Sequence, residues 1–238
     1  MYPHACARAR ELALEEAYVF VHPFDDPQVI AGAGTVAVEM LEDAPDLDTI
    51  VVPIGGGGLM SGIATAVRAL KPAIELIGVE AELYPSMKCA IEGCRLPLGG
   101  DTLAEGIAVK QPGELTSRIL KDLADEVVLV PERDLERAVA MLVGIEKTVV
   151  EGAGAAGLAA MLSQRSRFAG KKVATDQLQT ELDMESLDIE LPGLAAGQDF
   201  KAVLEAARRH LQMHKNFSLD NTLTQWERGY VEAALMIT

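Results

Sequence analysis

Four consecutive glycines directly after an apolar run are the strongest chemical signal in this sequence. The run over 49–54 is rich in β-branched residues, which predicts a strand covered on both faces. The glycines are Gly55, Gly56, Gly57 and Gly58, and a helical pattern begins at Leu59. Glycine lets the backbone turn tightly and approach a ligand closely, and free N–H groups at a helix N-terminus favour an anion. The segment therefore predicts a phosphate-binding loop, and a flexible turn is the alternative.

Two other kinds of glycine-rich loop do not fit. A P-loop needs a lysine followed by serine or threonine after its glycines, and here Leu59 and Met60 follow instead. A dinucleotide loop of the GxGxxG type needs an acidic residue about 20 positions further on, whereas residues 76–79 are apolar. The loop is thus predicted to bind the phosphate group of a ligand that neither of these two loop types binds.

Alternating strands and helices must hold this loop in place. Apart from 49–54, the patterns predict strands over 18–21, 74–79 and 127–130, and helices over 2–17, 28–42, 59–70, 85–93, 132–150 and 151–162. Asp25 and Asp26 are interpreted as turn and capping residues before the helix over 28–42. The alternation predicts an α/β fold, a three-layer parallel sheet flanked by helices.

A change of composition near Lys171 suggests how the chain is divided. Residues 1–174 are expected to form the α/β domain. The family resemblance described below implies that this domain is only partial. Residues 175–198 are polar and acidic without a clear period, which is typical of a linker. Two amphipathic patterns then predict a helical tail over 199–238.

Composition excludes several classes of partner. The 238 residues carry 36 acidic and 21 basic side chains, a net charge of −15 that disfavours nucleic acid over most of the surface. No apolar run long enough for a membrane span and no signal peptide is found. The three cysteines, Cys6, Cys89 and Cys94, imply no disulfide framework; they are interpreted as small buried thiols in a cytoplasmic protein.

Five segments, all in the same order, resemble the threonine dehydratase (threonine ammonia-lyase) family of fold-type II pyridoxal-phosphate enzymes. They are HPFDDPQVIAGAGT at 22–35, VPIGGGGLMSG at 52–62, GVE at 78–80, AEGIAVK at 104–110 and VVEGAGA at 149–155. The resemblance covers residues 2 to about 172. Serine racemases are close relatives of this family, so the small-molecule substrate is expected to be threonine or serine, and the sequence does not separate the two.

The resemblance implies pyridoxal 5′-phosphate as the cofactor and gives several residues a role in binding it. The cofactor phosphate would be held by the backbone amides of Gly55, Gly56, Gly57, Gly58 and Leu59. Gly106 would lie against the pyridine ring, where any side chain would collide, and Glu151 would also sit near the ring. In complete members of the family the reaction is β-elimination, which yields a 2-oxo acid and ammonia. A homo-oligomer is expected.

The same family resemblance implies a different kind of role for Glu80. It matches a position that binds a divalent cation in some family members, so it is the one candidate metal ligand. Ser86 stands where a second carboxylate would be needed, which weakens this interpretation. An exposed carboxylate after a strand is the alternative.

Two departures from the family pattern bear on activity. The family's cofactor-linked lysine lies in a motif of the type Ser-Phe-Lys-x-Arg-Gly-Ala, and no lysine of this chain has those neighbours. Thr175 also stands near the position where the family has a serine or cysteine beside the pyridine nitrogen. We therefore expect no ammonia-lyase activity from this chain alone. No catalytic residue is predicted.

Two alternatives to an enzyme remain open. One is a non-catalytic module that binds phosphate or pyridoxal phosphate. The other is a helical interaction module, because residues 223–235 resemble the helix before the helix-turn-helix of bacterial enhancer-binding transcription regulators. A DNA-reading segment would follow that helix, so no nucleic-acid binding is expected from the present chain.

Overall fold

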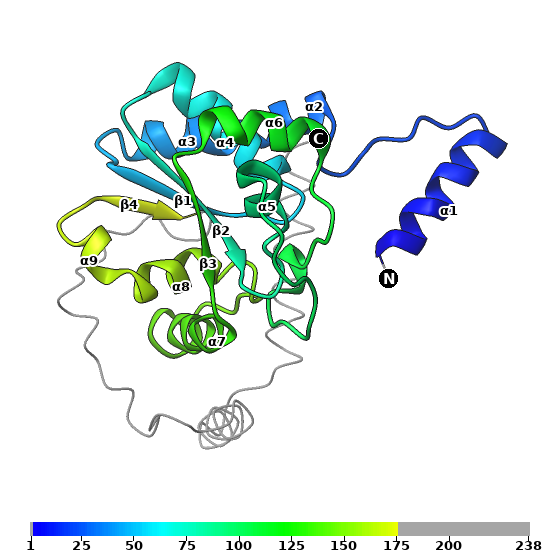
Figure 1. The fold of residues 1–238 in the computed structure, drawn as a ribbon. Helices are drawn as coiled ribbons and strands as arrows, with labels where there is room; N and C mark the ends of the chain where they lie inside the picture. The colour runs from blue at the N-terminus through cyan, green and yellow to red at the C-terminus, as the bar shows by residue number, and fades with distance from the viewer. Residues whose placement is uncertain (1, 176–238) are drawn as a thin grey trace, which may run out of the picture. The chain divides into compact units, whose positions relative to one another are not determined.

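A computed structural model describes residues 2–175, with side chains from residue 5 onward (Figure 1). The linker and helical tail expected over 175–198 and 199–238 lie outside the described residues, apart from residue 175. Within the described part, no helix is long and apolar enough to cross a membrane. The domain limits expected from the sequence stay a prediction.

Four parallel strands form one sheet in the order β3-β2-β1-β4 (Figure 1). β1 (Thr49–Pro53) lies between β2 (Glu75–Ala81) and β4 (Val173–Thr175), and β2 also pairs with β3 (Glu126–Val130). The chain adds β2 and β3 on one side of β1 and then β4 on the other side. The strand order therefore reverses at β1, and in open parallel sheets ligands bind outside the carboxyl ends of the strands at such a switch point.

Helices cover both faces of the sheet, which confirms the predicted three-layer α/β architecture (Figure 1). On one face α4 (Gly58–Leu70) packs against β1 and contacts α2 (Pro27–Ala33), α3 (Thr35–Asp43) and α6 (Glu114–Leu123). On the other face α8 (Ala156–Ser163) contacts β1, β2 and β3, and α7 (Glu132–Met141) packs on α8. The other helices are α1 (Tyr2–Glu15), α5 (Ser86–Glu92), α9 (Arg165–Phe168) and the 3₁₀ turn η1 (Glu105–Ile107).

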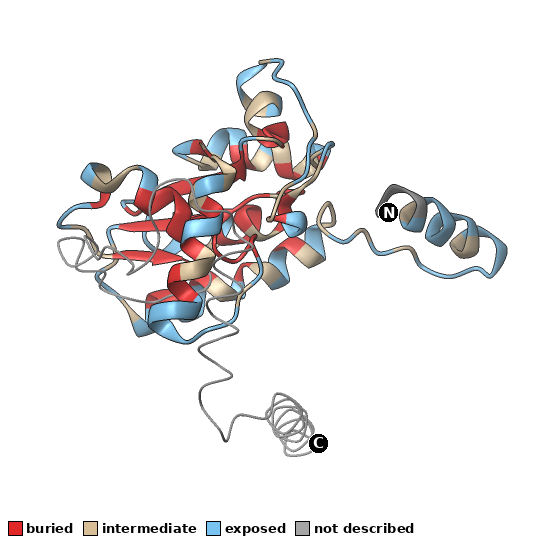
Figure 2. Ribbon diagram, turned by 90° about the horizontal axis from the view of Figure 1, so that it is seen from below, coloured by how far each residue is buried: buried red, intermediate tan, exposed pale blue. Residues whose placement is uncertain are grey.

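The core lies between the sheet and its two helical layers (Figure 2). All five residues of β1 are buried, as the continuous β-branched run predicts. Residues 152–162 are also buried throughout, and many of them are alanine or glycine. These small residues allow close packing: a Cβ added to Gly157 would lie 2.9 Å from the Cβ of Thr175.

Two helix predictions need correction. The helix expected over 28–42 is divided into α2 and α3 at Gly34, which lies against α4: a Cβ added to Gly62 would come within 2.6 Å of the Gly34 nitrogen. The helix expected over 132–150 leaves α-helical geometry after Met141 and ends in a π-helical turn, η2 (Leu142–Glu146). Residues 143–149 are exposed, so they lack the tertiary packing that stabilises most helices.

Two further differences concern whole elements. The strand expected over 18–21 is not formed, and the side chain of Val19 is 88% exposed. A strand needs a neighbour for its backbone groups, and none of the described strands pairs with this segment. Conversely, α6 was not predicted, although its residues Thr116 and Leu120 are buried.

The prediction for the cysteines is wrong for one pair. Cys89 and Cys94 form a disulfide, and both residues are only half-buried. Gly93 ends α5 in the left-handed conformation and turns the chain back, which brings the two Cα atoms to 4.4 Å. Cys6 is a free, half-buried cysteine.

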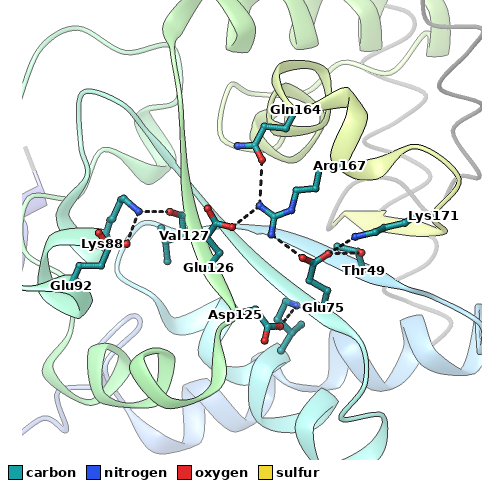
Figure 3. Close-up of polar contacts among 11 residues, drawn as sticks. Thr49, Glu75, Lys88, Glu92, Asp125, Glu126, Val127, Gln164, Arg167 and Lys171 are labelled. Atoms are coloured by element: carbon teal, nitrogen blue, oxygen red, sulfur yellow. Dashed lines mark hydrogen bonds and ion pairs between the residues drawn. The ribbon is translucent and has the colours of Figure 1, made fainter.

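An ionic cluster joins the amino ends of three strands (Figure 3). Glu75 accepts from Nη2 of Arg167 at 2.8 Å and from Nζ of Lys171 at 2.9 Å, and Glu126 accepts from Nη1 of Arg167 at 2.6 Å. Burial alone would raise the pKa of Glu75, but the hydrogen bonds from Arg167, Lys171 and Thr49 outweigh it and lower the pKa to about 2. These side chains pair with one another at the amino end of the sheet, whereas the glycine loop lies at the carboxyl end.

Candidate functional site

The glycine loop joins the carboxyl end of β1 to the N-terminus of α4, at the switch point of the sheet. Gly57 caps α4 with a φ of +95°, in the left-handed region that favours glycine. A Cβ at this position would lie 2.5 Å from Cε of Met87 and 2.8 Å from the Cβ of Thr116. Both the backbone angle and the close neighbours therefore require glycine here.

The N–H groups of this loop lack acceptors within the described residues. None of the amides of residues 55–59 donates a hydrogen bond there, and no side chain caps α4. Gly56, Gly57 and Gly58 are nevertheless buried. Buried backbone donors are normally paired, and an anion at a helix N-terminus would satisfy several of them at once. The loop thus fits the phosphate group that the sequence predicts.

Gly106 and Glu151 lie beside this loop, although they come from distant parts of the sequence. A Cβ added to Gly106 would be 2.7 Å from Oε1 of Glu151, and one added to Gly55 would be 3.2 Å from the Gly106 carbonyl oxygen. All three residues line a cleft of about 1460 Å³. The structure therefore brings together the residues that the family resemblance assigned to the cofactor, while their contacts with a pyridine ring stay a prediction.

Contacts with two other segments of the chain also hold the loop, and no sequence pattern indicates them. The Gly56 carbonyl oxygen accepts from Oγ1 of Thr116 at 2.7 Å and from the Gly113 amide at 3.2 Å. The ring of Phe24 packs on the loop, because a Cβ added to Gly56 would lie 2.3 Å from a ring atom. Thr116 is 60 residues from Gly56 in sequence, so no local motif could reveal the pair.

The two aspartates before α2 are both capping residues, but only Asp26 caps the helix for which it was predicted. Oδ1 of Asp26 accepts from the amides of Gln28 and Val29 at the start of α2. Asp25 instead caps α6: its carboxylate accepts from the Glu114 and Thr116 amides, each at 3.0 Å.

Glu80 is fully buried in β2, so the alternative of an exposed carboxylate is wrong. Its oxygens accept from the amides of Met87 at 2.7 Å and Lys88 at 2.9 Å, and from Oγ of Ser86 at 3.4 Å. Burial raises the pKa of Glu80 to about 7, and these hydrogen bonds only partly oppose the rise. No three potential metal-binding side chains gather anywhere in the described residues. The cation-binding role of Glu80 therefore stays a prediction.

Comparison with protein families decides the affiliation. Residues 2–175 match the family described as "Pyridoxal-phosphate dependent enzyme". The chain belongs to this family. The part of the chain that matches the pyridoxal-phosphate dependent enzyme family includes the whole sheet, the glycine loop, Gly106 and Glu151.

Curated relatives narrow the likeness to threonine ammonia-lyases. An L-threonine ammonia-lyase of Thermotoga maritima is 42% identical over 190 residues, which are 79% of this chain and 47% of that protein. A catabolic L-threonine dehydratase of Escherichia coli K12 is 42% identical over 159 residues, 66% of this chain and 48% of the relative. The chain thus spans about half the length of the curated relatives it matches.

Solved structures agree with the fold. A threonine deaminase of T.th. matches with a TM-score of 0.65 and 38% identity, over 69% of this chain and 62% of that one. The serine racemase of Dictyostelium discoideum matches with a TM-score of 0.64 and 31% identity, over 74% of this chain and 58% of the other. The resemblance inferred from the five sequence segments is confirmed.

Proposed function

We propose that this chain binds pyridoxal 5′-phosphate by its phosphate group and forms the cofactor-binding part of an ammonia-lyase for threonine or serine. The observation that carries the proposal is the set of backbone amides over residues 55–59, which find no acceptor in the described part of the chain and lie at the switch point of the sheet. The names of the relatives supply the substrate class, since threonine ammonia-lyases and a serine racemase are among them.

Each part of the cleft has a defined task in this proposal. The loop amides and the positive end of α4 bind the phosphate dianion. Gly106 has no side chain, so a flat ring can lie against its backbone, and the Glu151 carboxylate borders the same space. When bound, the cofactor supplies an electron sink for bond breaking at the α-carbon of an amino acid. The protein residues named here bind and orient it.

Binding of the phosphate can be tested without any catalysis. We expect pyridoxal phosphate to bind at least about tenfold more tightly than pyridoxal, because charge-assisted hydrogen bonds are the strongest polar contacts available. Inorganic phosphate should compete. Equilibrium dialysis with absorbance detection measures all three affinities. Equal affinity for pyridoxal and pyridoxal phosphate would refute the proposed role of the loop.

A pair of glycine variants tests the position of the ring. Gly106→Ala adds a methyl group within 2.7 Å of Oε1 of Glu151, inside the cleft. It should weaken pyridoxal phosphate binding but leave the affinity for inorganic phosphate unchanged. Gly32→Ala is the matched control, since a Cβ there meets nothing within 4 Å. Equal effects of both variants would contradict the proposed place of the ring.

Catalysis is a separate part of the proposal. With cofactor and threonine added, this chain alone should release ammonia no faster than a buffer blank, because none of its lysines lies in the family's lysine motif. A coupled ammonia assay checks this, and release above the blank would refute it. A cytoplasmic location and a homo-oligomer belong to the same proposal, and sedimentation measurements test the second.

A further inference from the structure

The peptide group between Gly56 and Gly57 is fixed by contacts behind the loop. Its carbonyl oxygen accepts from Oγ1 of Thr116 at 2.7 Å and from the Gly113 amide at 3.2 Å. Both donors lie at the start of α6, and Thr116 is 0% exposed. Because two buried donors bind the Gly56 carbonyl oxygen, the orientation of this carbonyl group is fixed.

Holding this carbonyl also sets the direction of an amide. In a trans peptide the C=O and the following N–H point in opposite directions within one plane. With the Gly56 oxygen directed at α6, the Gly57 N–H must point away from α6. Glycines on both sides of the peptide would otherwise allow it to rotate at little steric cost. The hydroxyl of Thr116 therefore opposes a rotation that the glycine sequence permits.

Asp25 holds Thr116 in place. Its carboxylate accepts from the amides of Glu114 and Thr116, each at 3.0 Å. A Cβ added to Gly113 would lie 2.1 Å from Oδ1 of Asp25, so the first turn of α6 sits directly on this carboxylate. The adjacent Phe24 packs on Gly56. One short segment thus contacts both the loop and the helix that supplies the hydroxyl.

We propose that Thr116 is a positioning residue for anion binding: its hydroxyl, held in place by Asp25, fixes the Gly57 N–H in the orientation that receives a phosphate. This inference rests on the proposed phosphate-binding function of the loop. Thr116 itself does not touch the ligand, and it acts only through the Gly56–Gly57 peptide.

Three variants separate positioning from general packing. Thr116→Val keeps the shape of the side chain but removes the donor, whereas Thr116→Ser keeps the donor. Ser117→Ala is the matched control, because Oγ of Ser117 donates to the Gly113 carbonyl at 2.6 Å in the same turn rather than to the carbonyl of Gly56. We expect Thr116→Val to bind inorganic phosphate and pyridoxal phosphate about tenfold more weakly. Thr116→Ser and Ser117→Ala should bind like the wild type, and the affinity for pyridoxal should stay the same in all of them.

Amide spectra provide a second measurement that needs no ligand. In protein labelled with ¹⁵N-glycine, the Gly57 signal should move in Thr116→Val and stay in place in Thr116→Ser and Ser117→Ala. If Thr116→Val fails to fold, phosphate affinity and the Gly57 signal can be measured in Asp25→Asn instead. This variant weakens the hydrogen bonds that hold the first turn of α6 but keeps the threonine hydroxyl. Unchanged phosphate affinity in a folded Thr116→Val protein would overturn the proposal, whether or not the Gly57 signal moves.

The two measurements also distinguish this inference from the proposed function. If the wild type binds neither phosphate nor pyridoxal phosphate, the proposed function fails. The Gly57 signal then still reports whether Thr116 fixes the peptide. If the wild type binds phosphate and Thr116→Val binds it equally well, the function stands and the positioning role is refuted.

Discussion

Glu80 is a titratable carboxyl group near the carboxyl end of β2, and we expect it to make the protein less stable as the pH rises from 5 to 8. The side chain is 0% exposed, and burial raises its pKa from an ordinary value of 4.5 to about 7. The folded state thus holds this proton more tightly than the unfolded chain does. The resulting stabilisation is complete below about pH 4.5 and is lost as the pH rises through about 7.

The size of the effect follows from the two pKa values. Their difference corresponds to about 3 kcal/mol in the free energy of unfolding. Because the carboxyl group is buried, screening by solvent does little to reduce this effect. Such a loss is a large part of the total stability of a domain of this size.

Urea unfolding between pH 5 and 8 measures the effect. Over this range the wild type should lose about 2.5 kcal/mol relative to Glu80→Gln, whose amide has no proton to release, because part of the full effect is already lost at pH 5. Glu82→Gln is the matched control, since Glu82 is exposed just beyond the same strand and should keep the wild-type profile. If wild type and Glu80→Gln show the same slope, or if the wild type gains stability over this range, the argument is refuted.

Three further predictions concern backbone strain, the ionic cluster and helix capping. Gly57→Ala should lower the free energy of unfolding by more than Gly93→Ala does. Both glycines have a positive φ, so each variant is strained by roughly 1–3 kcal/mol, but only Gly57 also has close neighbours that a methyl group would meet. Urea unfolding midpoints compare the two variants. Arg167→Met should raise the pKa of Glu75, which is lowered to about 2 in the intact cluster. The stabilisation from Glu75 is lost as the pH falls, so acid unfolding followed by circular dichroism should begin at a higher pH in this variant, and an unchanged acid transition would contradict it. Asp26→Ala should cost about 1 kcal/mol by removing the cap of α2, whereas Asp26→Asn should cost less, and thermal unfolding tests that order.

The buried centre of the fold could be predicted because its signals are local. The β-branched run that forms β1 and the glycines after it occupy adjacent positions, so one short window contains both the strand and the loop. The other predicted sheet strands, β2 and β3, show the same continuous apolar pattern. That Gly106 and Glu151 adjoin the loop followed only from the resemblance to a family, since nothing near them in sequence points to the loop.

The incorrect or missing predictions depend on contacts that sequence patterns do not contain. The apolar segment over 18–21 has the composition of a strand but no partner among the described strands. The disulfide depends on the left-handed turn at Gly93, and the cap of α6 by Asp25 spans 91 residues. Backbone turns and long-range hydrogen bonds of this kind become visible only when the chain is folded.

The support behind the glycine loop has a consequence for the order of folding. Its hydrogen bonds and packing contacts link Gly56 to segments before β1 and after β2, so the chain must close long loops before the peptide at Gly56 is held. Until those segments have docked, the turn at Gly56 lacks the contacts that orient its peptide, even where β1 and α4 have already formed. Phosphate binding would therefore report that these distant segments have reached their places around the loop.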